Sequence, residues 1–191
     1  MFGVRFHGRG GQGVVTAAEM LAVAAFLEGR HAQAFPSFGS ERTGAPVVSF
    51  CRIDDRPIRV REPVSEPNAL IIQDPTLFFQ VDVFSGLHAD GFLLVNSARS
   101  WAELQIADVV AGLPPRQVAG VPASELARRH VGRPLPNAAL LGGFAALTRL
   151  ISLGAVEAAI RETFSGAIAD GNVLAARGAY LVVHEKEYTD A

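Results

Sequence analysis

The chain has 191 residues and a formal net charge of −2, and 49% of its residues are hydrophobic. This length suits one domain, spanning residues 1–191, with a substantial core. A near-neutral charge without a basic run argues against nucleic-acid binding. No apolar run reaches the length of a membrane span, and no basic-then-apolar leader opens the chain. We therefore expect a cytoplasmic protein without membrane contact, which buries part of its apolar surface against other subunits.

The first elements are a strand, a glycine-rich loop and a helix. Val4-Arg5-Phe6 alternates apolar and charged residues, which is typical of a strand, and Val14 to Leu27, followed by Gly29, predicts a helix. Between them, Gly8-Arg9-Gly10-Gly11-Gln12-Gly13 satisfies the pattern G-x-G-x-x-G. Such a loop directs backbone N–H groups and the positive end of a helix to one point. We therefore predict that it binds a phosphorylated small molecule, with a purely structural role as the alternative.

The segment after the second predicted strand does not fit a dinucleotide site. Such a site needs an acidic residue about 20 residues beyond the loop to bind a ribose hydroxyl. Residues 31–40 contain no acid, and Glu41 is followed directly by Arg42. The segment instead offers Ser37, Ser40 and Arg42, whose side chains donate hydrogen bonds to phosphate oxygens.

The rest of the chain alternates strands and helices before it becomes helical. A β-hairpin is predicted after the second strand because two strand-like runs flank the turn at residues 54–57. The pattern predicts an α/β fold, namely a single Rossmann-like domain with a mostly parallel sheet flanked by helices, the inserted hairpin and a helical C-terminal part. The predicted strands are Val47–Ile53, Ile58–Val60, Ala69–Ile72, Phe92–Val95 and Arg116–Val121, and the predicted helices span 122–129, 137–150, 152–164 and about 172–183, with 76–83 weakly helical.

The sequence lacks the residues of a self-sufficient enzyme. Cys51 is the single cysteine, so this chain cannot ligate an iron–sulfur cluster or form an internal disulfide. No Walker lysine or G-x-S-x-G motif occurs, and the five histidines are scattered. His7 adjoins the glycine loop, and a structural role is favoured for it. Asp74 is predicted to form a turn or cap, whereas Gln12 is equally compatible with ligand contact and with bonding to neighbouring backbone.

Two long segments resemble a known family. Residues 5–13 and 33–47 are similar to the two signature segments of the gamma subunit of 2-oxoacid:ferredoxin oxidoreductases, such as pyruvate:ferredoxin oxidoreductase. The resemblance continues through Asp74-Pro75, residues 137–147 and residues 172–180, so that it covers most of the chain. The resemblance is specific, because two long motifs occur in the expected order and at the expected separation.

The resemblance implies a gamma-type subunit of an enzyme that oxidatively decarboxylates a 2-oxoacid to an acyl-coenzyme A. Thiamine diphosphate and iron–sulfur (4Fe-4S) clusters would reside in partner subunits of the alpha, beta and delta types, and ferredoxin or a flavin/NAD subunit would accept the electrons. This chain would not be catalytic itself but would help to hold coenzyme A. The implied contacts are Gly8, Arg9, Gly10, Gly11, Gln12, Gly13, Ser37, Ser40 and Arg42. Pyruvate, branched-chain, 2-oxoglutarate and aryl substrates all remain compatible.

Two alternatives belong to other functional classes. A stand-alone NADP-dependent reductase would place Arg42 on the 2′-phosphate, but the missing acid and the missing catalytic residue count against it. An assembly subunit whose glycine loop binds no ligand is the other alternative. Neighbouring genes that encode thiamine-motif and cysteine-rich proteins would identify the class.

Overall fold

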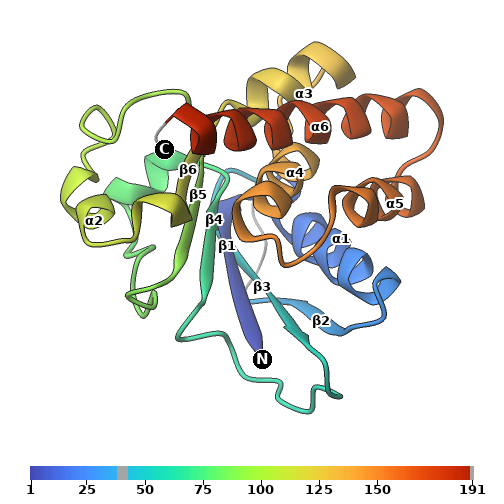
Figure 1. Cartoon of the computed structure of the whole chain (residues 1–191), viewed down its shortest axis with the longest axis horizontal. Helices are drawn as coiled ribbons and strands as arrows, with labels where there is room; N and C mark the ends of the chain where they lie inside the picture. Colours follow the sequence, from blue (N-terminus) through green and yellow to red (C-terminus); the bar gives the residue numbers. More distant parts are fainter. Residues whose placement is uncertain (38–42, 190–191) are drawn as a thin grey trace.

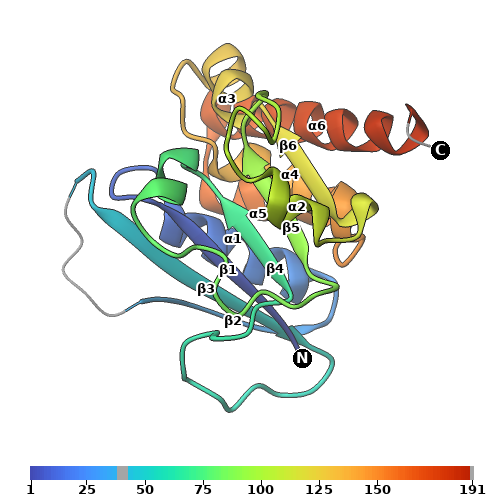
Figure 2. The same ribbon diagram turned by 90° about the vertical axis from the view of Figure 1, so that its left-hand side faces the viewer.

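A computed structural model describes residues 1–37 and 43–189, with the backbone alone described for 186–189. Its centre is one six-stranded sheet with the order β2-β3-β1-β4-β5-β6. Figures 1 and 2 show this sheet from two directions, with helices concentrated on one of its faces. The strands are β1 (Phe2–Arg9), β2 (His31–Pro36), β3 (Pro46–Asp54), β4 (Ala69–Ile72), β5 (Phe92–Asn96) and β6 (Val118–Val121).

The prediction of a mostly parallel sheet is confirmed, but the antiparallel hairpin is formed by other strands than those predicted. β1, β4, β5 and β6 are parallel neighbours, whereas β3 runs antiparallel to both β1 and β2. The hairpin therefore consists of β2 and β3, with Phe35 opposite Phe50. The prediction of a strand over Ile58–Val60 is wrong, because residues 57–61 lie in an irregular segment. β3 already pairs on both sides, which leaves no edge for that segment to join.

Four of the predicted helices are close to those observed, and the last differs. The final prediction began at Asn172, but α6 starts at Gly166, and Asn172 lies inside it and donates to the Ile168 carbonyl at 3.0 Å. No helix of the described residues, including the 24-residue α6, is both long and apolar enough to span a membrane. The helices are α1 (Val14–Leu27), α2 (Ala107–Ala111), α3 (Ala123–Val131), α4 (Asn137–Thr148), α5 (Leu153–Thr163) and α6, with short 3-10 helices η1 (Pro75–Phe79) and η2 (Pro115–Gln117).

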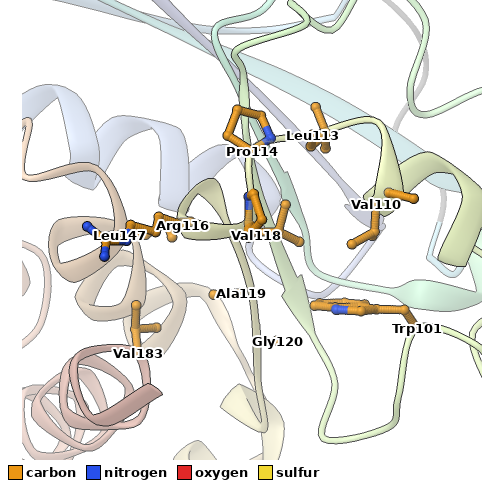
Figure 3. Close-up of a pocket in the computed structure, with 12 residues that line it drawn as sticks. Trp101, Val110, Leu113, Pro114, Arg116, Val118, Ala119, Gly120, Leu147 and Val183 are labelled. Carbon is orange, nitrogen blue, oxygen red and sulfur yellow. The ribbon is translucent and has the colours of Figure 1, made fainter. Parts of the chain in front are cut away.

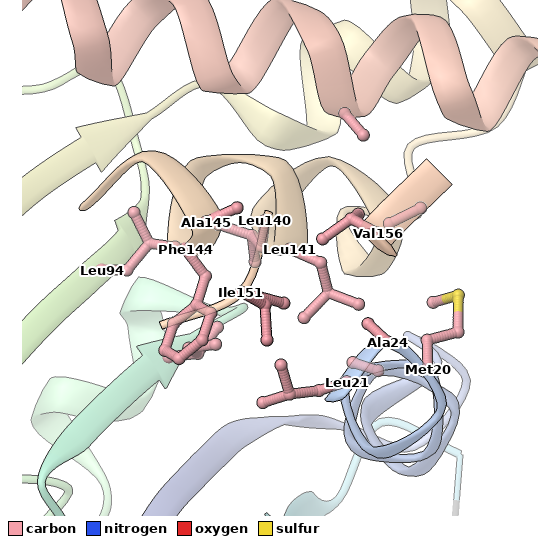
Figure 4. Close-up of a cluster of buried hydrophobic side chains, with 14 of the residues drawn as sticks. Met20, Leu21, Ala24, Leu94, Leu140, Leu141, Phe144, Ala145, Ile151 and Val156 are labelled. Carbon is pink, nitrogen blue, oxygen red and sulfur yellow. The ribbon is translucent and has the colours of Figure 1, made fainter. Parts of the chain in front are cut away.

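The larger hydrophobic core lies between the sheet and the helices α1, α4, α5 and α6. α4 occupies the middle layer, with the sheet on one side and α6 on the other, and its residues 137–147 are all buried. Figure 4 shows Phe144 beside Leu94 of β5, and Leu141 near Leu21 of α1. Burial on every side explains why the sequence of α4 is almost entirely apolar rather than amphipathic.

The opposite face of the sheet has a smaller core and thinner cover. β1 alternates in the expected way, because Val4 and Phe6 enter the large core while Arg5 and His7 face the other side. A second cluster, covered by η1, α2 and irregular segments, includes Leu70, Ile72, Leu77, Leu93 and Val95. Arg5 is buried here and donates to backbone carbonyls, including that of Val83 at 3.0 Å. Its guanidinium thus fastens the irregular segments to the sheet.

Candidate functional site

The glycine loop leaves the carboxyl end of β1 at the edge where ligands of open α/β sheets bind. Asp74, which follows the adjacent strand β4, joins the loop there through hydrogen bonds to Arg9 and Gln12. Asn96, at the end of β5, connects to the same edge by donating to the Gln73 carbonyl at 2.8 Å. The carboxyl ends of β1, β4 and β5 therefore share one hydrogen-bonded edge.

Arg9 braces the glycine loop rather than reaching out from it. Its Nε lies 3.1 Å from Asp74 Oδ2, and one Nη donates to the Gly44 carbonyl at 3.0 Å. The other Nη donates to Thr76 Oγ1 and Gln80 Oε1 at 2.7 and 3.0 Å. The guanidinium thus links the loop, η1 and the start of β3. The sequence could not reveal this role because the partners lie 35 to 71 positions away.

Gln12 and Asp74 complete this brace. Gln12 Oε1 accepts from the Arg9 backbone N–H at 2.8 Å, and its Nε2 donates to Asp74 Oδ2 at 3.0 Å. Asp74 also caps η1 by accepting from the backbone N–H and hydroxyl of Thr76. Burial opposes ionisation of Asp74, but the bonds from Thr76 and Gln12 and the charge of Arg9 outweigh it and lower its pKa. The expected turn or cap role of Asp74 is confirmed.

The backbone amides of the loop fall into two groups. Gly10 exchanges hydrogen bonds with the start of β3, donating to Ala45 at 2.9 Å and accepting from Gly44 at 3.0 Å. Gln12 N–H donates to the Arg9 carbonyl. Within the described residues, the N–H groups of Gly11, Gly13 and the first turn of α1 (residues 14–16) donate to no acceptor. This second group provides the donors that an anion at a helix N-terminus requires.

Close packing requires glycine at two positions of the loop, whereas a third glycine has free space around it. A Cβ on Gly8 would lie 2.6 Å from Val14 Cγ2, and a Cβ on Gly13 would lie 2.5 Å from Asn137 Nδ2. Gly13 also has a φ of +69°, which disfavours any other residue. Gly11 has a φ of +92°, but a Cβ there would meet no atom within 4 Å. Gly11 is therefore the position at which a ligand has room to approach the loop.

The predicted contacts after β2 are only partly described. Ser37 is exposed, and its backbone N–H donates to the Val48 carbonyl at 2.9 Å, which extends the hairpin. Ser40 and Arg42 lie outside the described residues. Thr43, the first residue that the structure describes after this segment, forms a β-bridge with Gly10 of the loop. Thr43 thus lies beside the glycine loop.

His7 and Gln73 lie beneath the loop and are both buried. His7 Nε2 accepts from Arg5 Nε at 3.0 Å, and burial, reinforced by the Arg5 charge, lowers the pKa of His7 to about 3. His7 is therefore neutral and unsuited to general acid catalysis near pH 7. Within the described residues, the side-chain amide of Gln73 has no hydrogen-bond partner, whereas its backbone N–H donates to the His7 carbonyl at 2.7 Å. No sequence pattern indicated Asn137 as a neighbour of the loop, because only the fold brings the start of α4 there.

Together these features define a class: an α/β domain whose glycine loop presents backbone N–H groups without an acceptor at a helix N-terminus. Burial raises the pKa of the Cys51 thiol, so this cysteine is not a thiolate nucleophile. Within the described part of the chain, no three histidine, cysteine or acidic side chains are grouped to hold a metal ion.

The comparisons with known proteins agree on one family. The model described as "Pyruvate ferredoxin/flavodoxin oxidoreductase" matches residues 3–182, and the chain belongs to this family. The common gamma subunit of pyruvate/ketoisovalerate oxidoreductases from Pyrococcus abyssi is 47% identical over 182 residues, which cover 94% of this chain and 96% of that one. The pyruvate synthase subunit PorC from Methanothermobacter marburgensis is 46% identical over 180 residues, with the same coverage. The expected family resemblance is confirmed.

Solved structures show the same fold. The pyruvate oxidoreductase subunit PORC of Thermotoga maritima has a TM-score of 0.78 and 32% identity, covering 95% of this chain and 96% of that one. A 2-oxoglutarate:ferredoxin oxidoreductase from Magnetococcus marinus, solved with 2-oxoglutarate, coenzyme A and succinyl-CoA bound, has a TM-score of 0.73. Its identity is 13%, so it shares the fold, and 97% of this chain matches 31% of that chain.

Proposed function

We propose that this chain is the gamma subunit of a multi-subunit 2-oxoacid:acceptor oxidoreductase and that its glycine loop holds a phosphate of coenzyme A. The proposal rests on the backbone N–H groups of Gly11, Gly13 and the first turn of α1, which have no hydrogen-bond acceptor within the described residues. Coenzyme A is rich in phosphate groups, and a helix N-terminus with free amides stabilises such anions. The absence of a ribose-binding acid between residues 31 and 40 favours it over a dinucleotide.

In this proposal the chain contributes position rather than bond chemistry. Thiamine diphosphate and iron–sulfur clusters, held by alpha, beta and delta-type subunits, would carry out oxidative decarboxylation, with ferredoxin or a flavin/NAD subunit as acceptor. The gamma chain would orient the coenzyme A thiol toward the acyl group, which speeds a bimolecular step by proximity. The brace of Arg9, Gln12 and Asp74 would keep the loop in one shape, so that little entropy is lost when the phosphate binds.

The test is substitution of Gly11 in the assembled complex. Gly11→Val should raise the apparent Michaelis constant for coenzyme A by about 10-fold to 100-fold, which corresponds to roughly 1.5–3 kcal/mol of charged hydrogen bonding. Decarboxylation up to the thiamine-bound intermediate should stay close to normal, because that step does not use coenzyme A. Steady-state saturation curves and single-turnover decarboxylation measure the two effects separately.

Two variants complete the design. Arg42→Ala should act in the same direction as Gly11→Val if its guanidinium binds a phosphate. Gly13→Ala should instead destabilise the strand–helix junction, because its Cβ would meet Asn137. A Cβ on Gly11 has no such clash, although the φ of +92° strains any residue other than glycine, so binding is tested only in a Gly11→Val complex that is shown to be fully assembled and that decarboxylates normally. An unchanged coenzyme A saturation curve in that complex would leave the loop as a packing device, which is the assembly-subunit alternative.

A further inference from the structure

Two helices begin beside the glycine loop. α1 starts directly after Gly13, and α4 starts at Asn137, whose side chain packs against that glycine. A Cβ on Gly13 would lie 2.5 Å from Asn137 Nδ2, so a larger residue would push the two helix ends apart. Because the N-terminus of each helix carries a partial charge of roughly +0.5, the two ends together attract an anion more strongly than either does alone.

Asn137 directs an unused donor toward this point. The residue is 4% exposed, and its Oδ1 accepts from the Ala138 backbone N–H at 2.9 Å. Within the described residues its Nδ2 donates to no acceptor, and neither do the backbone N–H groups of Asn137 and Ala139 in the first turn of α4. A donor that is left unpaired on a buried side chain is destabilising, and a bound anion is one explanation for it.

A second carboxamide lies at the other end of the loop. Gln73 is 1% exposed, and neither Oε1 nor Nε2 of its side chain has a hydrogen-bond partner among the described residues. A Cβ on Gly8 would lie 3.0 Å from Gln73 Oε1 and 2.6 Å from Val14 Cγ2, so this carboxamide and the first residue of α1 approach the same point of the loop. Carboxamides with unpaired N–H groups therefore flank the loop at Gly8 and at Gly13.

The donors at this point are uncharged, because Arg9, the cation of the loop itself, is engaged elsewhere. Its guanidinium bonds to Asp74 and to the Gly44 carbonyl. A terminal phosphate monoester carries nearly two negative charges and is favoured by an arginine or lysine partner. Each phosphate of a diphosphate diester carries a single charge, which suits backbone and carboxamide N–H groups at helix ends.

A cavity elsewhere in the chain does not suit the same group. It has a volume of about 890 Å³ and lies beside β6, and Trp101, Leu113 and Val183 are among its apolar lining residues (Figure 3). Arg116 is the one charged residue of this lining. A diphosphate requires several converging N–H donors, which the two helix ends provide, whereas the lining of this cavity is mostly apolar.

We propose that the ends of α1 and α4 together bind the diphosphate of coenzyme A. One phosphate lies at the N–H groups of Gly11 and the first turn of α1, and the adjoining phosphate lies at Asn137 Nδ2, next to the positive end of α4. The inference rests on the proposed function, which it deepens by identifying the phosphates and by adding Asn137 to the site. The terminal 3′-phosphate of the coenzyme then lies outside this site.

Asn137→Asp tests the added residue in the assembled complex. The carboxylate retains an acceptor for the Ala138 N–H and is favoured by the two helix ends, so the variant should assemble, but it replaces the Nδ2 donor by a charge that repels phosphate. Dephospho-coenzyme A retains the diphosphate and lacks the 3′-phosphate. The apparent Michaelis constants for coenzyme A and for dephospho-coenzyme A should therefore rise by the same factor, about tenfold or more.

Asn68→Asp is the matched control. Asn68 lies just before β4, at the end of that strand opposite to the loop, and its Oδ1 accepts from the Gly3 backbone N–H at 2.8 Å. The substitution adds the same charge and keeps the same kind of hydrogen bond, so both Michaelis constants should stay at the wild-type values. An equal rise in Asn68→Asp would overturn the proposal, because added charge alone would then explain the effect.

The remaining outcomes separate this proposal from the proposed function. Unchanged constants in Asn137→Asp, together with a raised constant in Gly11→Val, would place Asn137 outside the site. A rise for coenzyme A without a rise for dephospho-coenzyme A would assign the loop to the 3′-phosphate. Both results would overturn the diphosphate site and leave coenzyme A binding intact. Unchanged saturation in Gly11→Val as well would contradict the proposed function instead.

A competition measurement on the wild-type complex requires no substitution. With free Mg²⁺ held constant, inorganic pyrophosphate should compete with coenzyme A at a concentration about tenfold lower than inorganic phosphate, because only pyrophosphate reaches both helix ends. This preference should be lost in Asn137→Asp. Equal inhibition of the wild-type complex by the two anions would overturn the proposal, because the loop would then hold a single phosphate.

Discussion

Arg5 and His7 are polar residues in the interior, and they are hydrogen-bonded to each other. Arg5 donates to His7 and to backbone carbonyls of the irregular segments that cover the sheet. Because His7 Nε2 accepts from Arg5, the neutral imidazole carries its proton on Nδ1. Burial, with the Arg5 charge in addition, lowers the pKa of His7 from 6.5 to about 3. A structural histidine next to the glycine loop thus links folding stability to pH.

The sign of this linkage leads to a prediction. Below pH 6.5 the unfolded chain binds a proton on His7 that the folded chain does not bind, so stability falls as the pH drops toward 3. Between pH 7 and pH 5, the wild type should lose about 1–2 kcal/mol more unfolding free energy than His7→Gln. Urea unfolding of dilute protein at both pH values measures the difference.

The variant and its control are matched. Gln retains an acceptor for Arg5 but does not titrate. His88→Gln, at an exposed position, should leave the pH dependence of the wild type unchanged. The same pH dependence in the wild type and in His7→Gln would mean that His7 is protonated in the folded chain.

At the scale of elements, the contact between α4 and α6 depends on a glycine. A Cβ on Gly142 would lie 2.0 Å from the Ala176 carbonyl oxygen, so the two helix backbones touch at this point. Ala175, Ala176 and Ala179 are buried on the same helix, which keeps α6 close to α4 along its length. Small residues thus determine how closely α6, the outer helix, packs against α4.

Substitution of this glycine should therefore be costly despite the helix propensity of alanine. Gly142→Ala should destabilise the chain by about 1–3 kcal/mol, because the two helices must move apart. Gly154→Ala is the control, since the nearest atom to its Cβ would be Ser152 Oγ at 3.7 Å. That change in α5 should be neutral or stabilising by up to about 1 kcal/mol. Equal unfolding midpoints in denaturant for the two variants would show that α6 tolerates displacement.

At the scale of the whole molecule, several large apolar side chains remain exposed. Phe26 is 71% exposed and Phe79 is 65% exposed, and α6 carries Ile168 and Leu181, both 55% exposed. These side chains lie on α1, η1 and α6, so apolar surface is exposed on more than one side of the chain. This pattern is what a subunit of a larger assembly requires.

We therefore expect the isolated chain to self-associate or aggregate. Co-expression with thiamine-binding partner subunits should keep it dispersed and bring it into a defined complex, because the exposed apolar side chains are then buried. Sedimentation velocity of the isolated chain and of the co-purified complex measures both states. A sharply unfolding monomer in isolation, with no gain from the partners, would contradict this expectation.

The local patterns of the sequence were sufficient for most of the elements. The alternation in β1, the apolar run of β4 and the alanine-rich stretch of α1 each predict an element that the structure contains, since strand and helix periods depend on near neighbours in sequence. The start of α6 was misjudged at Asn172, because an asparagine that suits a cap is also tolerated inside a tightly packed helix. The two signature segments were long enough to indicate the family, and the comparisons confirm it.

Long-range pairing required the tertiary structure. β3 enters between β1 and β2, and no local pattern distinguishes that arrangement from a hairpin with Ile58–Val60. The glycine pattern marked the loop, but which of its backbone amides have an acceptor depends in part on the pairing of Gly10 with Gly44 and Ala45, just before β3 and far away in sequence. By itself, the sequence determined most of the elements, the position of the glycine loop and the family, because these depend on local periodicity and on motifs. Only the tertiary structure decided which backbone N–H groups of the loop lack an acceptor and how the strands are ordered, because hydrogen-bond partners and strand order are properties of the assembled sheet.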